Sequence, residues 1–224
     1  MLTSSASGKA FPPSQTAPRS SRRPRRTRQT LRRNDEFRVV CLGGSAGGLQ
    51  AYMDILRNLP ADTGMAFVIA PHRALENAHL LPQLLSTVTK MPVVEVEQGM
   101  PLEPDHVFVM PPRKDMTMAG DVFQLRTTAR PPGWPKTINI FLYSLAKVTG
   151  QRAVAVILSG LDGDGSAALK AIKAGGGFTF AQSDAAYPSM PRTAVETGHI
   201  DYLLPAADIA KALLVLAHEP LQAG

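Results

Sequence analysis

The sequence predicts an α/β protein with a doubly wound, mostly parallel sheet, helices on both faces of the sheet and a small appended β-hairpin. Past residue 37, apolar runs of strand length alternate with segments of helical periodicity. This alternation is typical of parallel strands that are connected by helices. The run 153–158 is continuously apolar, as expected of a central strand that is buried on both faces.

The expected strands are short apolar runs bounded by glycine, proline or polar residues. They cover residues 38–43, 65–71, 92–96, 106–111, 153–159, 177–182 and 200–204. The expected helices cover residues 47–59, 77–89, 138–149, 165–175, 191–198 and 206–217. Within residues 113–126, two short alternating runs flank Ala119-Gly120-Asp121, which predicts the hairpin. The prolines of residues 127–137 predict a surface loop.

The charge of the chain is divided between two segments. The 224 residues together carry a formal net charge of +6. Residues 1–34 hold one lysine, eight arginines and no acidic residue, which gives +9 and leaves 6 − 9 = −3 for the rest. This basic segment has too few large apolar residues to offset the entropy lost on ordering it. We therefore expect a disordered basic arm over residues 1–37 and one folded domain over residues 38–224.

A basic arm of this kind binds nucleic acid, an acidic membrane or an acidic partner in some proteins, and is a solvated extension in others. Its lack of acidic residues also fits an organellar transit peptide. The chain contains neither an apolar stretch of about 20 residues nor a signal-peptide core, so we expect no stable membrane insertion. The single cysteine, Cys41, excludes an internal disulfide and fits a cytoplasmic location. Within the first strand, we expect it to act as a buried apolar residue and not as a nucleophile.

The glycine-rich segment 43–48 is the most informative part of the chain. It follows an apolar run and precedes a helix-like stretch, which is the context of a G-x-S-x-G nucleophile elbow. Its glycines allow a sharp turn, and the helix N-terminus offers N–H groups for a developing oxyanion. Ser45 is therefore a candidate nucleophile. A phosphate-binding turn is the alternative, although Ser45 occupies the second glycine position of G-x-G-x-x-G and no Gly-Lys-Ser/Thr follows.

Two further strand ends carry residues that could assist Ser45. His72 follows the second strand, and the loop 159–165 with Asp162 and Asp164 follows the apolar run 153–158. Because parallel strands end at one edge of the sheet, these groups predict a Ser-His-Asp triad. Asp162 and Asp164 compete for the acidic role, and the alternative role for one of them is to cap the helix 165–175. His199 is the second choice of base, because a helix-to-strand loop lies at the opposite edge.

The acidic loop does not predict a metal site. The Asp162-x-Asp164-Gly165 string resembles the start of a calcium loop, but the third acid and the terminal glutamate are missing. No histidine or cysteine spacing predicts zinc, so we expect no metal and no organic cofactor. The order Ser, His, Asp differs from the Ser, Asp, His order of ordinary α/β-hydrolases and predicts a separate, convergent family.

Residues 38–217 resemble the catalytic domain of the chemotaxis protein-glutamate methylesterases (CheB type). The resemblance depends on several short motifs that occur in the family's order. These motifs are residues 43–48, 70–72, 107–112, 157–165, 175–182 and 190–192. The segment 111–115 resembles most the methylesterase modules that are fused to methyltransferases or lack a receiver domain.

The resemblance implies hydrolysis of glutamate γ-methyl esters on chemoreceptors, with deamidation of glutamine side chains in some members. It implies that Ser45 is the nucleophile and His72 the general base. It also implies that Asp164 is the orienting acid, because the family's acid immediately precedes the glycine of an Asp-Gly pair. By the same resemblance, the backbone N–H groups of Ala46 and Leu161 would face the oxyanion.

The resemblance also places Met190 near the site, and it reveals differences from the family. Ala46 stands where the family often has a threonine, and Thr137-Ile138-Asn139 replaces a triplet of the Ser-Val-Asp kind. The regulatory receiver domain is not matched. We therefore expect constitutive activity, control by a separate response regulator, or a substrate other than a receptor.

The expected partners are a methylated chemoreceptor or similar protein, and an acidic partner for the basic arm. Two other functions remain open. The first is a non-catalytic signalling or scaffold module that retains the fold. The second is a nucleotide-binding protein that uses residues 43–48 as a phosphate loop.

Overall fold

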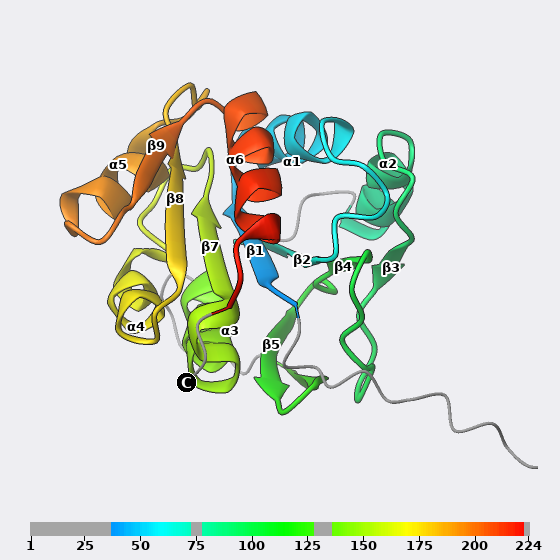
Figure 1. Ribbon diagram of the computed structural model, residues 1–224. Helices are drawn as coiled ribbons and strands as arrows, with labels where there is room; N and C mark the ends of the chain where they lie inside the picture. Colours follow the sequence, from blue (N-terminus) through cyan, green and yellow to red (C-terminus); the bar gives the residue numbers. More distant parts are fainter. Residues whose placement is uncertain (1–36, 73–77, 128–135, 222–224) are drawn as a thin grey trace, which may run out of the picture. The chain divides into compact units, whose positions relative to one another are not determined.

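The computed structural model describes residues 37–72, 78–127 and 136–221. The predicted basic arm up to residue 36 and most of the predicted loop 127–137 lie outside these ranges. In the described part, seven strands form one sheet in the order β3-β4-β2-β1-β7-β8-β9 (Figure 1). Every neighbouring pair in this sheet is parallel, which confirms the predicted doubly wound fold.

The elements follow the predicted alternation closely. The strands of the large sheet are β1 (Val39–Gly44), β2 (Ala66–Pro71), β3 (Val93–Glu95), β4 (Val107–Val109), β7 (Ala153–Ile157), β8 (Phe178–Gln182) and β9 (Tyr202–Leu204). The α-helices are α1 (Gly48–Arg57), α2 (Leu81–Ser86), α3 (Thr137–Thr149), α4 (Leu169–Ala174), α5 (Ser189–Glu196) and α6 (Ala206–His218). Within the described ranges, no helix has the length and apolar character needed to cross a membrane.

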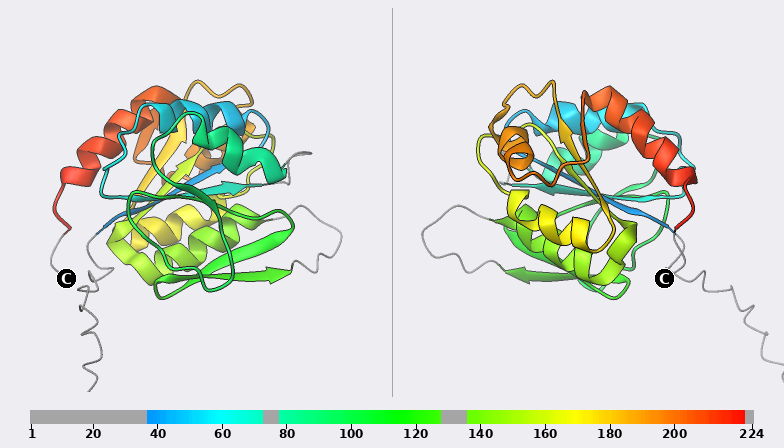
Figure 2. Two further views of the ribbon diagram at one scale, coloured as in Figure 1. Left: turned by 90° about the vertical axis from the view of Figure 1, so that its right-hand side faces the viewer. Right: turned by 60° about the vertical axis from the view of Figure 1, so that its left-hand side comes forward.

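Helices cover both faces of the sheet (Figure 2). Successive side chains of a strand point to opposite faces, and β1 therefore contributes to two cores. Val39 and Cys41 belong to the core shared with α3, α4 and α5. Val40 and Leu42 belong to the core shared with α1, α2 and α6. A strand that is apolar at every position is thus explained by burial on both sides.

The predicted hairpin consists of β5 (Lys114–Ala119) and β6 (Val122–Thr127), which pair antiparallel. Gly120 at its tip has a φ of 57°, a left-handed conformation that favours glycine. The hairpin forms a sheet of its own. It packs on α3, where the rings of Phe123 and Phe141 lie 6.5 Å apart between centroids. It is therefore appended to a helix rather than hydrogen-bonded to the large sheet.

Two predicted helices are shorter than expected because each begins with a 3₁₀ turn. The helix predicted at 77–89 consists of the 3₁₀ turn Ala78–Leu80 followed by α2. The helix predicted at 165–175 consists of the 3₁₀ turn Ser166–Ala168 followed by α4. In the second case the preceding residue, Gly165, has a φ of 93°, which no α-helix accommodates.

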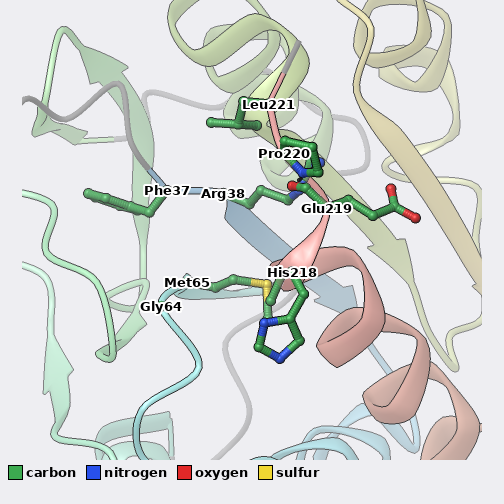
Figure 3. A pocket seen from close by; sticks show the side chains of 9 residues that line it. Phe37, Arg38, Gly64, Met65, His218, Glu219, Pro220 and Leu221 are labelled. Carbon is green, nitrogen blue, oxygen red and sulfur yellow. Dashed lines mark hydrogen bonds between the residues drawn. The ribbon is translucent and has the colours of Figure 1, made fainter.

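A pocket of about 380 Å³ lies at the amino-terminal edge of the strands (Figure 3). Its walls are the residues before β1 and β2 and the end of α6: Phe37, Arg38, Gly64, Met65 and residues 217–221. The Arg38 guanidinium donates to the carbonyls of Leu216 and Gln151, each at 3.1 Å, and so connects α6 to the start of β1. Ligands of parallel α/β sheets bind at the other, carboxyl-terminal edge, where the predicted catalytic residues lie.

Candidate active site

The register of the central strands brings Ser45 and His72 to the same edge of the sheet. Gly44 pairs with Pro71, so the next residue on each strand is Ser45 on one and His72 on the other. The His72 N–H donates to the Gly44 carbonyl at 2.9 Å, and the Ser45 N–H donates to the Ser159 carbonyl at 2.8 Å. The loops after β2, β1 and β7 therefore meet where the strand order changes direction, the usual position of a ligand site in this architecture.

The turn around Ser45 requires glycine for steric reasons. Gly47 has a φ of 74°, and a β-carbon there would lie 2.6 Å from Ser159 Oγ. A β-carbon on Gly44 would lie 2.8 Å from the Tyr52 hydroxyl. Gly48 starts α1 directly after this turn, and its N–H donates to the Ser45 carbonyl at 2.9 Å. The strand, turn and helix that the sequence predicts around Ser45 are thus present.

Ser159 connects the Ser45 turn to the loop before α5. Its hydroxyl donates to the Ala46 carbonyl at 2.8 Å and accepts from the Tyr187 N–H at 2.9 Å. Its own N–H donates to Gln182 Oε1 at 3.0 Å. In the sequence, the one signal for this role of Ser159 is its position at a strand end. These bonds hold the backbone of the Ser45 turn in place from the β7 side.

His72 faces both aspartates that competed for the acidic role. Its side chain is 1% exposed. Its Nε2 atom lies 2.9 Å from Asp162 Oδ2 and 4.0 Å from Asp164 Oδ2. Only the shorter distance is within hydrogen-bond range. The structure therefore brings His72 together with Asp162 directly and with Asp164 as a nearby charge.

Asp164 caps a helix from a distant part of the chain. Its Oδ2 accepts the Ile138 N–H at 2.9 Å, and its Oδ1 accepts the N–H groups of Asn139 at 3.1 Å and Gly165 at 2.9 Å. Ile138 and Asn139 lie in the first turn of α3, where N–H groups have no partner within the helix. As one alternative, the sequence predicted an aspartate cap for the helix at 165–175, whereas Asp164 mainly caps α3. Burial raises the pKa of the Asp164 carboxyl, and these hydrogen bonds and His72 oppose the rise.

Gly160 and Met190 pack directly beside Ser45. Met190 is fully buried, and its N–H donates to the Gly160 carbonyl at 3.1 Å. A β-carbon on Gly160 would lie 2.3 Å from Met190 Sδ and 3.1 Å from Ser45 Cβ. Among the hydrogen bonds of the described residues, none has the N–H of Ala46 or of Leu161 as its donor. Both groups therefore meet one requirement of oxyanion donors, namely that no acceptor in the described part of the protein occupies them.

A second pocket, of about 260 Å³, lies beside α5 at the same side of the sheet. Its lining combines apolar side chains with one arginine: Gln182, Ser183, Pro188, Pro191, Arg192, Val195 and Leu203. Leu161, in the loop after β7, is 63% exposed, and Leu203 is 53% exposed. Leu203 thus adds an exposed apolar side chain to the lining of this pocket.

The other candidates from the sequence occupy structural positions. Cys41 is 1% exposed in β1, as predicted for a buried apolar residue, and burial raises the pKa of its thiol. The His199 carbonyl accepts from Thr179 Oγ1 at 2.6 Å, near the start of β8 and hence at the opposite edge from Ser45. In the described ranges, no group of three or more His, Cys, Asp or Glu side chains is placed to hold a metal ion.

Known proteins of one family are similar to this chain. The family model "CheB methylesterase" matches residues 40–213. Protein-glutamate methylesterase/protein-glutamine glutaminase 2 of Pseudomonas aeruginosa is 33% identical over 183 residues, which are 79% of this chain and 52% of that protein. The protein-glutamate methylesterase/protein-glutamine glutaminase of Bordetella pertussis is 31% identical over 205 residues, 88% of this chain and 58% of that protein.

A solved structure has the same fold. The CheB methylesterase catalytic domain of Thermotoga maritima superposes with a TM-score of 0.76 and is 26% identical, and the match covers 80% of this chain and 98% of that domain. This chain spans between 52% and 58% of the length of the two curated relatives named above. The match thus extends over a complete catalytic domain, and we conclude that this chain belongs to the CheB methylesterase family.

Proposed function

We propose that this chain is a serine carboxylesterase that hydrolyses glutamate γ-methyl esters on chemoreceptor-type proteins, in chemotaxis or related signalling. One observation carries the proposal. Ser45 and His72 follow register partners on adjacent parallel strands, and two carboxylates face the His72 ring. The relatives are named for the same activity. A hydroxyl, an imidazole and a carboxylate at one strand edge are the groups that acyl transfer requires.

The first half-reaction forms an acyl-enzyme. Ser45 Oγ adds to the ester carbonyl, and its proton passes to the His72 imidazole. The carbonyl oxygen becomes an oxyanion, for which the N–H groups of Ala46 and Leu161 are the proposed donors. When the tetrahedral intermediate collapses, the methoxy group takes the proton from His72 and leaves as methanol. The glutamyl group is then bound to Ser45 as an ester.

The second half-reaction restores the enzyme. Water adds to the acyl carbonyl while His72 accepts its proton, and collapse returns that proton to Ser45 Oγ and releases a glutamate carboxyl group. A glutamine side chain would follow the same steps with ammonia as the leaving group, which accounts for deamidation. Neither half-reaction requires a group from outside the chain other than water.

Asp164 is the proposed acid of the triad, and its position allows it to stabilise the charged His72 ring. Its carboxylate lies 4.0 Å from Nε2 and is almost fully buried. Opposite charges at this distance attract one another, and burial reduces their screening by water. Asp164 therefore favours the imidazolium state without a direct hydrogen bond. Met190, packed at Gly160, is the proposed neighbour of the bound substrate.

The surroundings of the site support a protein substrate. The pocket beside α5 and the exposed side chains of Leu161 and Leu203 offer apolar contact area near the loop after β7. We also propose a cytoplasmic location, which agrees with the free, buried thiol of Cys41. A separate response regulator is the proposed regulator, and an acidic protein the proposed partner of the basic arm.

Substitution of Ser45 tests the nucleophile. Ser45→Ala should abolish methanol release from a methylated receptor while the circular dichroism spectrum and melting temperature stay unchanged. Ser86→Ala is a matched control, because Ser86 is exposed at the end of α2 and its hydroxyl donates to the Gln83 carbonyl at 2.7 Å. Methanol release by Ser45→Ala at the wild-type rate would remove the proposed nucleophile.

A fluorophosphonate probe separates the esterase from the scaffold alternative. Labelling of the wild-type protein at Ser45, and its loss in Ser45→Ala, is expected of an activated serine. A wild-type protein that is not labelled and releases no methanol would favour a non-catalytic module. A nucleotide titration followed by thermal shift tests the phosphate-loop alternative, and we expect no stabilisation.

A further inference from the structure

We propose that Asp162 is a positioning residue of this site, and that it holds the His72 ring through a direct hydrogen bond to Nε2. The inference rests on the proposed esterase function and adds to it a second acid with a role of its own. In this arrangement Asp162 fixes the orientation and the tautomer of the imidazole. Asp164 holds the loop and α3 in place and contributes charge from a greater distance.

The distances distinguish the two carboxylates. Asp162 Oδ2 lies 2.9 Å from His72 Nε2, and Asp164 Oδ2 lies 4.0 Å from the same atom. In an N–H···O hydrogen bond, the nitrogen and oxygen atoms are about 2.7–3.2 Å apart. Asp162 meets this condition and Asp164 does not. Because His72 is 1% exposed, water has little access to replace the Asp162 contact.

The carboxylate of Asp162 is held in this position by its own loop. Its Oδ1 accepts the N–H of Asp164 at 2.8 Å, a local bond to the backbone two residues on. This Asx-type bond fixes the side-chain rotation. With Oδ1 engaged in this way, Oδ2 is the oxygen that reaches His72. Each oxygen of Asp162 thus has one defined partner.

The carboxylate of Asp164 is committed to the backbone instead. It accepts three N–H groups, from Ile138, Asn139 and Gly165. Two of them belong to the first turn of α3, so a movement of Asp164 toward His72 would leave buried donors without an acceptor. This commitment explains why the more buried carboxylate is the one farther from the ring.

The contact with Asp162 determines which nitrogen of His72 carries the proton. An ionised carboxylate only accepts hydrogen bonds, so Nε2 must be the N–H nitrogen of the neutral ring. Nδ1 then keeps the lone pair and is the atom that receives a proton during the reaction. Without the Asp162 carboxylate, neither the tautomer nor the orientation of the His72 ring would be fixed. This loss would lower the rate of proton transfer from Ser45.

The first test measures the hydrogen bond without using activity. Proton NMR of the full-length protein with ¹⁵N-labelled histidine should show a strongly downfield Nε2 proton that exchanges slowly with water. Asp162→Asn should remove this signal, because the amide can still accept the Asp164 N–H but presents its NH₂ group to Nε2. Asp208→Asn is the matched control: Asp208 pairs with Lys211 on the exposed side of α6. A signal that persists in Asp162→Asn would overturn the proposal.

The second test measures catalysis. General bases contribute about 10²–10⁴-fold, and Asp164 remains as a nearby charge, so Asp162→Asn should lower kcat roughly tenfold to a hundredfold and leave KM unchanged. The acidic limb of the pH profile should move to lower pH. Among the described residues, the charged groups that face the ring are Asp162 and Asp164, and the charge of Asp164 also raises the pKa of the buried Cys41 thiol. Removal of one negative charge makes the imidazolium easier to deprotonate.

Asp162→Glu keeps the charge and should recover part of the lost activity. An Asp162→Asn enzyme with the kcat and pH profile of Asp208→Asn would overturn the positioning role and leave the proposed esterase intact. If the wild-type protein releases no methanol but its Nε2 signal depends on Asp162, the proposed function fails and the contact is supported. The two failures are therefore distinguishable.

Discussion

Substitution of Gly160 by alanine should impair the site through steric overlap alone. Gly160 has no left-handed φ, so its backbone conformation accommodates alanine. The new β-carbon would lie 2.3 Å from Met190 Sδ, 3.0 Å from Met190 Cβ and 3.1 Å from Ser45 Cβ. The Gly160 backbone cannot shift freely, because its N–H donates to the Tyr187 carbonyl and its carbonyl accepts the Met190 N–H.

These distances set the expected magnitude. Carbon atoms in contact are about 3.5–4.0 Å apart, so Ser45 Cβ must move by roughly half an ångström or more. Overpacking of a close-packed site costs about 1–3 kcal/mol of folding free energy. Displacement of a reacting group by about 1 Å costs about 10²-fold in rate. We therefore expect Gly160→Ala to lose about 1–3 kcal/mol of stability and roughly tenfold to a hundredfold of kcat.

The assay compares Gly160→Ala with a variant of similar stability loss. Gly64→Ala introduces a β-carbon at a φ of 70° with no atom within 4 Å, at the opposite edge of the sheet. It should cost about 1–2 kcal/mol through backbone strain and leave kcat unchanged. Urea unfolding and methanol release are measured on both proteins. Equal kcat values for the two variants would refute the steric reasoning, as would wild-type activity and stability in Gly160→Ala.

Three further predictions concern stability and reactivity. Burial raises the pKa of the Asp164 carboxyl, so the folded protein retains this proton to higher pH than the unfolded chain. The free energy of unfolding of the wild-type protein, relative to that of Asp164→Asn, should therefore fall as the pH rises from the ordinary pKa value of 3.8 through the raised value. Urea titrations in which this difference rises over the same pH window would contradict the prediction. Arg38→Met should cost about 2–3 kcal/mol in urea unfolding, because the buried bond to the Leu216 carbonyl and the partly buried bond to the Gln151 carbonyl lose their charged donor, and an unchanged midpoint would exclude this role. Cys41 should react with iodoacetamide only after unfolding, since burial raises the pKa of its thiol; rapid labelling of the native protein would show that β1 is accessible.

Much of the fold is predictable from local patterns. The continuous apolar run in β7 and the two-sided β1 predict buried parallel strands, because each side chain must find an apolar neighbour on its own face. The glycines around Ser45 predict a sharp strand-to-helix turn. The structure gives the steric reason, because β-carbons at these positions would overlap the side chains of Ser159 and Tyr52. These features depend on residues that are close in sequence or on one strand.

The helix ends were less predictable. The 3₁₀ turns before α2 and α4 depend on how each helix docks and not on its periodicity alone. The hairpin was recognisable from its turn, but its packing on α3 depends on contacts such as Phe123 with Phe141, which are distant in sequence. No local pattern specifies which surface an amphipathic hairpin will cover.

The sequence alone determined the alternating α/β architecture, the edge of the sheet at which Ser45, His72 and the acidic loop would meet, and the burial of Cys41. Only the tertiary structure decided how the two aspartates divide their contacts, with Asp162 at 2.9 Å from His72 Nε2 and Asp164 on the first turn of α3. The physical reason is that strand periodicity specifies which loops share an edge. The direction of a carboxylate within a loop depends instead on backbone donors that other parts of the chain supply.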